Sequence, residues 1–381
     1  MIGLVFLARN GEGMDALRRF AFSYLAHKPG IPHQLIIILK GYENDDNGEA
    51  EVRSFFDQFR PLYTRVSDEY YDISAYLLAA QQHQNNETFC FLNTHTVIAA
   101  DNWLELLYGP LTLPNVGLVG SSGSYESLYS SVKLRAKVEW LTAHHKVPFD
   151  AQMARYIGLM LQDRGRDWLV PQNDRRLRME HGHYYANALE PEWREFWATI
   201  SGPGGEHHYL QNFDPFPQPH IRSNGFMIRR DEFIKWFSEI EPSKIDADYF
   251  ESGKQGLTAQ LKASGQRALV VDRFGKTYEE DAWPQSKTFR HGDQLGLLLT
   301  DNQTRAFDKM SEFERQTYAL ITWGDAAVEF SYNLGLRFST NGAISESPFH
   351  IIDHLEYGTP HRFKNDHCPV FGHEQHCWPP S

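Results

Sequence analysis

The sequence predicts an α/β fold in which a mostly parallel central sheet is flanked by helices. Short apolar runs recur through the first 120 residues, and each is followed by a segment whose apolar residues are spaced as on one face of a helix. One run, Gln34–Leu39 (QLIIIL), has the continuous aliphatic pattern of a strand covered on both faces of a parallel sheet. Strands separated by helices of this length pair in parallel through right-handed crossovers.

The apolar runs of this first part have the length of buried strands. The expected strands are Ile2–Ala8, Gln34–Leu39, Leu62–Val66, Thr88–Leu92 and Val116–Gly120. Helices are expected over 11–26, near 51–58, over 72–83, and after Asp101, which we expect to cap its helix. Ligands of such sheets bind at the carboxyl ends of the strands. The loops after Ala8, Leu39 and Leu92 are therefore the first candidates for a site.

The pattern changes after residue 120. Residues 125–220 are rich in Trp, His and Arg and helical in pattern, with no clear strand, so we expect a helical insertion there. The later expected elements are strands at Ile221–Arg229 and Arg267–Val271 and helices at Asp231–Ile240, Gly256–Ala263 and Arg305–Trp323. We therefore expect one α/β domain over 1–300, followed over 301–381 by a helical extension and an irregular tail rich in His and Cys.

Composition excludes several classes of function. The chain has 381 residues, and 37 Lys and Arg against 49 Asp and Glu give a formal net charge of −12, which argues against nucleic-acid binding. No apolar run approaches the roughly 18–20 residues that span a bilayer. The start, MIGLVFLARNGEG, has the pattern of a strand rather than of a signal peptide. Three cysteines in a chain of this length fit a reducing compartment, so we expect a cytoplasmic protein.

The most specific segment follows the fourth expected strand. In ETFCFLNTHTVIAADNWLELLYGPL a buried strand leads to the polar triad Asn93, Thr94 and His95, then to a short extended piece and a Trp-bearing helix. This layout resembles the family 2-like glycosyltransferases of the GT-A fold, which is Rossmann-like. The segments IGLVFLARNGEG, QLIIILKGYEND, RSNGFMIRRDEF and DADYFESGKQGLTAQLKASGQRALVV resemble other parts of that family in the same order. The resemblance covers about 1–120 and 221–275.

The resemblance implies the transfer of a hexosyl or deoxyhexosyl group from a nucleotide sugar to a hydroxyl of a saccharide or lipid-linked saccharide, with inversion. It implies a role in surface or exported polysaccharide synthesis, with a peripheral position at the inner face of the membrane left open. The residues it assigns to the nucleotide sugar are Ala8, Arg9, Asn10, Lys40, Glu43, Asn93, Thr94 and Lys254. Among these, Glu43 is the acid nearest to the family's nucleobase-binding position.

A base that takes the proton of the acceptor hydroxyl must lie within hydrogen-bond reach of it. The family carries this carboxylate in a Glu-Asp pair, but strict register puts Gly253 and Lys254 at those positions. The nearest carboxylates are those of Asp246, Asp248 and Glu251; we prefer Glu251 as the base, then Asp248. The alternative is that Asp246 and Asp248 form a helix-capping or turn pair.

The family binds a divalent ion through an Asp-x-Asp motif, which Asn93-Thr94-His95 replaces here. His can bind Mn²⁺ and Asn offers a carbonyl oxygen, but two fewer anionic ligands weaken a site for Mn²⁺ or Mg²⁺. Three alternatives stay open. In the first, His95 and a distant ligand such as His291 hold a metal ion. In the second, basic side chains replace the metal, and in the third, the protein has lost catalysis.

Two other functions stay open at this stage. The first is a catalytically inactive relative that binds a sugar or nucleotide within an assembly complex, as the missing Asp-x-Asp suggests. The second is a zinc-dependent hydrolase, although no HExxH motif is present. The tail segment His361–Cys377 has the residue types of a zinc site but none of the paired-cysteine spacings, and we expect it to be disordered.

Overall fold

The computed structural model of the chain describes residues 1–133, 136, 140, 190–235, 244–310 and 312–324. The chain divides into two compact units. The first consists of Met1–Ser124 and Pro219–Asp308, and the second of Tyr125–Gln218 and Lys309–Ser381. Among the described residues, no helix is both long enough and apolar enough to cross a bilayer.

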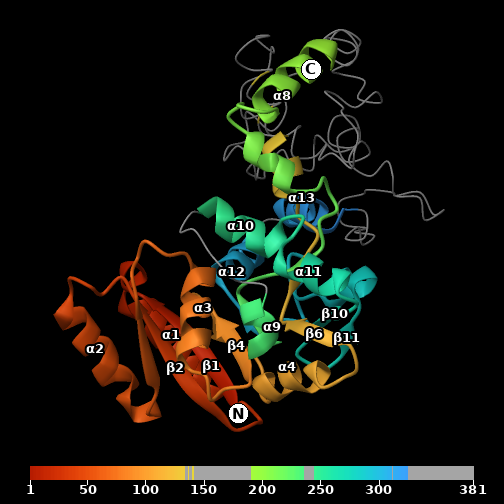
Figure 1. Cartoon of the computed structure of the whole chain (residues 1–381). Coiled ribbons are helices and arrows are strands. Elements are labelled where there is room, and N and C mark those ends of the chain that lie inside the picture. The colour runs from red at the N-terminus through yellow and green to blue at the C-terminus, as the bar shows by residue number, and fades with distance from the viewer. Residues whose placement is uncertain (134–135, 137–139, 141–189, 236–243, 311, 325–381) are drawn as a thin grey trace, which may run out of the picture. The chain divides into compact units, whose positions relative to one another are not determined.

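An eight-stranded sheet with the order β11-β10-β6-β9-β4-β1-β2-β3 forms the centre of the first unit (Figure 1). Its strands are β1 (Ile2–Arg9), β2 (His33–Lys40), β3 (Leu62–Val66), β4 (Thr88–Leu92), β6 (Val116–Gly120), β9 (Gly225–Arg229), β10 (Arg267–Val271) and β11 (Thr277–Tyr278). Strand β1 pairs in parallel with β2 and β4, β2 with β3, and β10 with β6. Strand β9 runs antiparallel between β4 and β6, and β11 is antiparallel to β10. The prediction of a mostly parallel sheet flanked by helices is confirmed.

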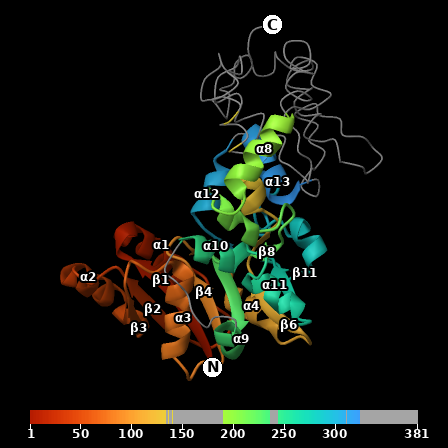
Figure 2. The ribbon, with the colours of Figure 1, turned by 45° about the horizontal axis from the view of Figure 1, so that its top comes forward.

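Helices cover both faces of this sheet because its strands are apolar on both sides. On one face Phe6 of β1 stacks on Phe20 of α1 (Gly13–Ala26), with ring centroids 3.8 Å apart. The helices α2 (Asp46–Phe56) and α4 (Trp103–Leu111) contribute to the same core. On the other face the ring of Phe91 in β4 packs against Tyr76 of α3 (Asp72–Gln82) and Phe233 of α9 (Arg230–Lys235). The ring centroids are 4.8 Å apart in each pair. Figures 1 and 2 both show α3 and α9 side by side.

Shorter elements complete the first unit. Two small antiparallel ladders pair β5 (Val97–Ile98) with β12 (Leu299–Thr300), and β7 (Gly123–Ser124) with β8 (His220–Ile221). The remaining helices are α10 (Lys244–Ser252), α11 (Leu257–Ala263), α12 (Asn302–Asp308) and the 3₁₀ turns η1 (Asn10–Glu12), η2 (Asp57–Phe59) and η6 (Glu280–Ser286). The strand expected over Ile221–Arg229 is therefore two strands, β8 and β9.

The expectation that Asp101 caps a helix is wrong. The N-cap of α4 is Asn102, which has a left-handed backbone (φ 58°) and makes no capping hydrogen bond with its side chain. The Asp101 Oδ1 instead accepts a hydrogen bond from the backbone N of Lys28 at 3.1 Å. This carboxylate therefore fixes the loop after α1.

The described part of the second unit is helical. It contains α8 (Glu190–Ser201), η5 (His208–Asn212) and α13 (Glu312–Trp323). The rings of Trp140, Trp193 and Trp197 form its apolar centre, with neighbouring centroids 5.6 and 5.7 Å apart. The single helix expected over Arg305–Trp323 is two helices, α12 and α13. Most of the expected insertion, the end of the helix expected over Asp231–Ile240 and the His- and Cys-rich tail lie outside the described residues.

Candidate functional site

Two cations and one carboxylate meet at the carboxyl ends of three neighbouring parallel strands. Arg9 ends β1 and Lys40 ends β2, and the two are register partners. Asp68, two residues beyond β3, accepts hydrogen bonds from Arg9 Nε at 2.8 Å, from Arg9 Nη2 at 3.0 Å and from Lys40 Nζ at 2.9 Å. Hydrogen bonding by Arg9, together with Lys40, holds the pKa of Asp68 well below its ordinary value. The carboxylate pairs Lys40, which is only 3% exposed, so the loop after β3 belongs to the site.

Further predicted residues tie these loops to one another. Asn10 Nδ2 donates to the carbonyl oxygen of Gly41 in the loop after β2, at 3.0 Å. Glu43 Oε1 accepts a hydrogen bond from the backbone N of Asp68 at 3.1 Å. The side chain of Ala8 lies in the core, so Ala8 offers a ligand only its backbone.

The triad after β4 forms a turn that is closed by its own side chain. Asn93 Oδ1 accepts hydrogen bonds from the backbone N of His95 and from Thr96 Oγ1, both at 3.0 Å. Thr94 is buried. His95 Nε2 lies 3.4 Å from Glu12 Oε2, which belongs to the loop after β1. The triad therefore presents the imidazole of His95, while Asn93 acts within the turn.

These residues do not fit a metal site of the kind that the family resemblance implies. The Asn93 oxygen already accepts a hydrogen bond from the backbone N of His95, and Thr96 Oγ1, which can also donate to the backbone oxygen of Asn224, lies 3.0 Å from it. His291 is buried in the loop between η6 and β12. In the part of the chain that the structure describes, no three or more His, Cys, Asp or Glu side chains are grouped so that they could hold a metal ion. His95 and Glu12 alone leave most of a six-coordinate shell empty.

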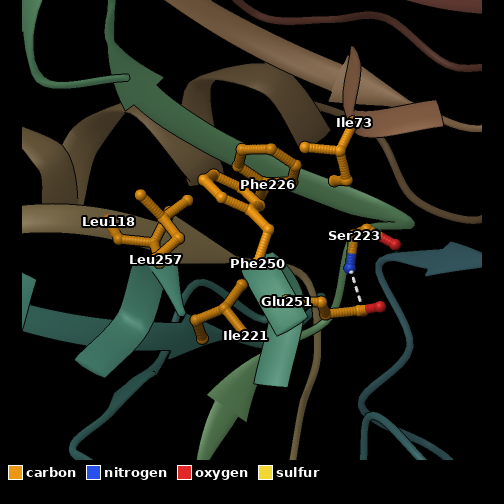
Figure 3. Close-up of a pocket in the computed structure, with 8 residues that line it drawn as sticks. All are labelled: Ile73, Leu118, Ile221, Ser223, Phe226, Phe250, Glu251 and Leu257. Carbon is orange, nitrogen blue, oxygen red and sulfur yellow. Dashed lines mark hydrogen bonds between the residues drawn. The ribbon is translucent and has the colours of Figure 1, made fainter. Parts of the chain in front are cut away.

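Glu251 lines a small, largely apolar pocket (Figure 3). It lies on α10, and its Oε1 accepts a hydrogen bond from the backbone N of Ser223 at 2.7 Å. The pocket has about 240 Å³ of empty space, its open mouth included. Its other lining residues are Ile73, Leu118, Ile221, Phe226, Phe250 and Leu257. Glu251 is the one ionisable side chain among them.

The other two residues predicted on this segment lie outside the pocket lining. Asp248, one turn earlier on α10, is 33% exposed and lies 3.6 Å from Lys244 Nζ. Burial raises the pKa of Asp248, and the nearby charge of Lys244 lowers it. Lys254 is exposed in the turn between α10 and α11. Glu251 is therefore better placed than Asp248 to act on a bound molecule.

Asp72 connects the two halves of the site. It is the first residue of α3 and is half-buried. Burial raises the pKa of Asp72, while the charges of Lys40, Arg9 and His95 lower it and that of Glu251 raises it further. Ile73, the next residue of α3, lines the pocket together with Glu251, so α3 begins between the strand-end loops and the pocket. The site is thus continuous from Arg9 to Glu251.

Sequence reasoning missed both Asp68 and Asp72. Asp68 lies in the loop after β3, the next parallel strand after β2, and Asp72 is the first residue of α3, where that loop ends. The strand-end rule that singled out the loops after Ala8, Leu39 and Leu92 applies equally to the loop after Val66, and it would have found both carboxylates.

The loop before β9 also reaches this edge because β9 runs opposite to its neighbours. Arg222 Nη2 forms a buried ion pair with Asp301 Oδ2 at 2.9 Å, and its guanidinium lies 3.6 Å from the centre of the Phe289 ring. Asn224 Oδ1 accepts a hydrogen bond from Ser122 Oγ at 3.1 Å. Since Ser223 binds Glu251, this loop joins the pocket to the loop after β6.

Comparison with known proteins gives weak similarities only. No protein-family model matches the chain, and no curated protein matches it. Among solved structures, a mannosyltransferase from Pyrobaculum calidifontis in complex with GDP-Man and Mn²⁺ is 10% identical over 94% of this chain and 70% of its own, with a TM-score of 0.34. Mouse xyloside xylosyltransferase 1 is 10% identical over 71% of this chain and 86% of its own, with a TM-score of 0.33. GalNAc-T7 with UDP, GalNAc and Mn²⁺ is 17% identical over 33% of this chain and 23% of its own, with a TM-score of 0.26. These scores are too low to establish a shared fold, so function has to be argued from the residues of this chain.

Proposed function

We propose that the chain is a GT-A-type glycosyltransferase that moves a sugar from a nucleotide-sugar donor to a saccharide hydroxyl. The observation that carries the proposal is that the segment from Asp68 to Ile73 joins two groups of residues. Asp68 binds Arg9 and Lys40, and Ile73 lines the pocket that contains Glu251. This continuity supports one site in which a polar, charged side faces the donor and an apolar, carboxylate-bearing side faces the acceptor. The ordered resemblance of the sequence segments to this class supports the same function.

The donor side is supported by the cluster of Arg9, Lys40 and Asp68. The two cations keep Asp68 ionised at neutral pH, and an ionised carboxylate is a strong acceptor for the N–H and O–H groups of a nucleoside. Asn10 and Glu43 hold the surrounding loops in place. We assign the nucleoside of the donor to this cluster, and its diphosphate to the neighbouring turn after β4.

The acceptor side is supported by the pocket at Glu251. One carboxylate oxygen is fixed by the N–H of Ser223, which leaves the other to accept the proton of an acceptor hydroxyl. In a direct displacement the acceptor oxygen bonds to the anomeric carbon as the bond from that carbon to the diphosphate breaks, and the proton passes to Glu251. The rings of Phe226 and Phe250 in the pocket wall suit the apolar face of a sugar. We propose inversion, and an acceptor from surface polysaccharide synthesis, on the family resemblance.

A second function is favoured by the turn at Asn93. The residues after β4 do not supply the carboxylates that the family uses for a metal, and a chain that had lost catalysis would show the same feature. The alternative is therefore a protein that binds a nucleotide sugar without transferring the sugar.

The experiment that tests the proposal measures binding and turnover separately. The full chain is titrated by calorimetry with UDP-, GDP- and dTDP-sugars, and release of the nucleotide is then followed with Mn²⁺ and with EDTA. We expect one donor class to bind and to be hydrolysed slowly without an acceptor. Binding without any turnover, in the presence of saccharide acceptors, would favour the non-catalytic alternative. If none of these nucleotide sugars binds, both functions are refuted.

A further inference from the structure

Two arginines lie beside the turn after β4, and none of the roles above uses them. Arg305 of α12 is half-buried, and its Nη1 donates to the backbone oxygen of His95 at 3.1 Å and to Thr300 Oγ1 at 3.3 Å. Arg19 of α1 is exposed, and its positive charge acts on Arg305. Neither arginine forms an ion pair with any residue in the described part of the chain.

Two contacts bring these arginines to the same place. β12 pairs with β5, with Thr300 opposite Val97, so α12 begins directly beside the segment that follows the triad. Ser23 Oγ accepts a hydrogen bond from the backbone N of Ile98 at 3.0 Å. Because Ser23 lies one helical turn after Arg19 on α1, the same contact sets Arg19 beside β5. The guanidinium of Arg305 is thus held by a backbone oxygen and a hydroxyl, and not by a carboxylate.

Arg18, the neighbour of Arg19 on α1, differs from both arginines because it has carboxylate partners, Asp15 at 3.2 Å and Glu51 at 3.6 Å. Two carboxylates lie near Arg305 in sequence, and each already has another partner. Asp301 Oδ2 is paired with Arg222, and Asp308 Oδ1 accepts a hydrogen bond from Gln294 Nε2. Burial and the like charge of Arg19 both lower the pKa of Arg305. An anion bound between the two arginines would relieve this repulsion.

We propose that Arg305, assisted by Arg19, binds the diphosphate group of the nucleotide sugar in place of a metal ion. This inference rests on the proposed function, and it corresponds to the alternative in which basic side chains replace the metal at the triad. A planar guanidinium matches phosphate oxygens in a two-pronged geometry. The bond from Arg305 to the His95 carbonyl fixes the arginine at the strand end where the donor's diphosphate is expected, and the residues after β4 do not fit a metal.

The test is calorimetric titration of the full chain in EDTA with UDP, GDP and inorganic pyrophosphate, and with uridine and guanosine. The variants are Arg305→Gln, Arg305→Lys and Arg19→Gln. The matched control is Arg18→Gln, which removes the same charge from the adjacent position of α1 but from an arginine that has its own carboxylates. Thermal unfolding of each variant shows that the fold is kept.

We expect a nucleoside diphosphate and pyrophosphate to bind without metal. Arg305→Gln should lower the affinity for both ligands by about tenfold or more, because a hydrogen bond to a charged group is lost. The affinity for the nucleoside should be unaffected. Arg305→Lys should recover part of the loss, Arg19→Gln should have a smaller effect, and Arg18→Gln none.

The other outcomes separate this inference from the proposed function. Nucleotide binding that needs Mn²⁺, or that is equal in wild type and Arg305→Gln, would overturn the inference and leave the function standing. Pyrophosphate binding that depends on Arg305, with no preference for any nucleotide, would support the anion site and contradict the nucleotide-sugar function. If neither pyrophosphate nor a nucleoside diphosphate binds with or without Mn²⁺, both proposals fail.

Discussion

The carboxylate of Glu251 and the backbone N–H of Ser223 are joined by a hydrogen bond of 2.7 Å, which links α10 to the loop before β9. This bond orients a carboxylate that lines a pocket with otherwise apolar side chains. An oriented carboxylate with one oxygen left for a ligand is what a general base requires.

Replacing Glu251 by Gln should abolish most of the transferase activity. The amide oxygen can still accept the bond from Ser223, so the fold and the donor affinity should be unchanged. Turnover should fall by about 10²–10⁴-fold, because the proton acceptor is lost. The control is Glu87→Gln, at the opposite end of β4, where the side chain is 90% exposed. A larger loss in Asp248→Asn than in Glu251→Gln would transfer the role to Asp248.

Replacing Asp72 by Asn should stabilise the protein at neutral pH and impair its function. Because burial raises the pKa of Asp72, its ionised form is less favourable in the folded than in the unfolded state. Its contribution to stability is complete below the ordinary pKa of 3.8 and is lost as the pH rises through the higher pKa of the folded state. The midpoint of thermal unfolding of Asp72→Asn should therefore exceed that of wild type at pH 7, and the difference should shrink towards pH 4. An equal difference at both pH values would contradict the assigned ionisation.

The stack between α1 and β1 should dominate the stability of the first unit. Phe20→Ala removes a ring that is fully buried and lies 3.8 Å from Phe6, and it should cost about 3–5 kcal/mol of unfolding free energy. Phe22→Ala makes the same change on the same helix at a side chain that is 62% exposed, and it should cost far less. Denaturant unfolding of both variants measures the difference, and equal losses would refute the assigned packing.

Mild acid should destabilise the fold through His83. Its Nε2 lies 2.8 Å from Thr64 Oγ1, and burial lowers its pKa below the ordinary 6.5. The unfolded chain then binds the proton more readily than the folded chain, so stability is complete above pH 6.5 and falls as the pH drops towards the pKa of the folded state. His83→Gln keeps a polar partner for Thr64 but does not titrate. Denaturant unfolding at pH 7.5 and 5.5 should show a smaller pH effect in His83→Gln than in wild type.

The strands were predictable because each is a local apolar run, and Leu62–Val66, Thr88–Leu92 and Val116–Gly120 lie where the pattern indicates them. The antiparallel insertion of β9 was not predictable, since the partners of a strand are set by contacts between residues far apart in sequence. The cap at Asp101 was mispredicted because the left-handed backbone of Asn102 starts the helix one residue later.

The site was predictable in part, for a related reason. The positions of Arg9 and Lys40 at strand ends pointed to these two residues. Glu251 was selected because its segment resembles part of the glycosyltransferase family. Arg305 could not be found in this way, because it reaches the turn after β4 only through the pairing of β12 with β5. Asp72 begins a predicted helix, and its place in the site follows from neighbours that only the folded chain brings together.

The reversed direction of β9 has a practical consequence for protein engineering. Variation intended to change the ligand of the pocket belongs in the segment before this strand, at Ile221 of β8 and at Ser223, which line the pocket. The carboxyl end lies at the opposite edge of the sheet, where the backbone N of Arg230 bonds to the oxygen of Glu87. Asp231, whose side chain is 95% exposed, is therefore a position for attaching a label away from the pocket.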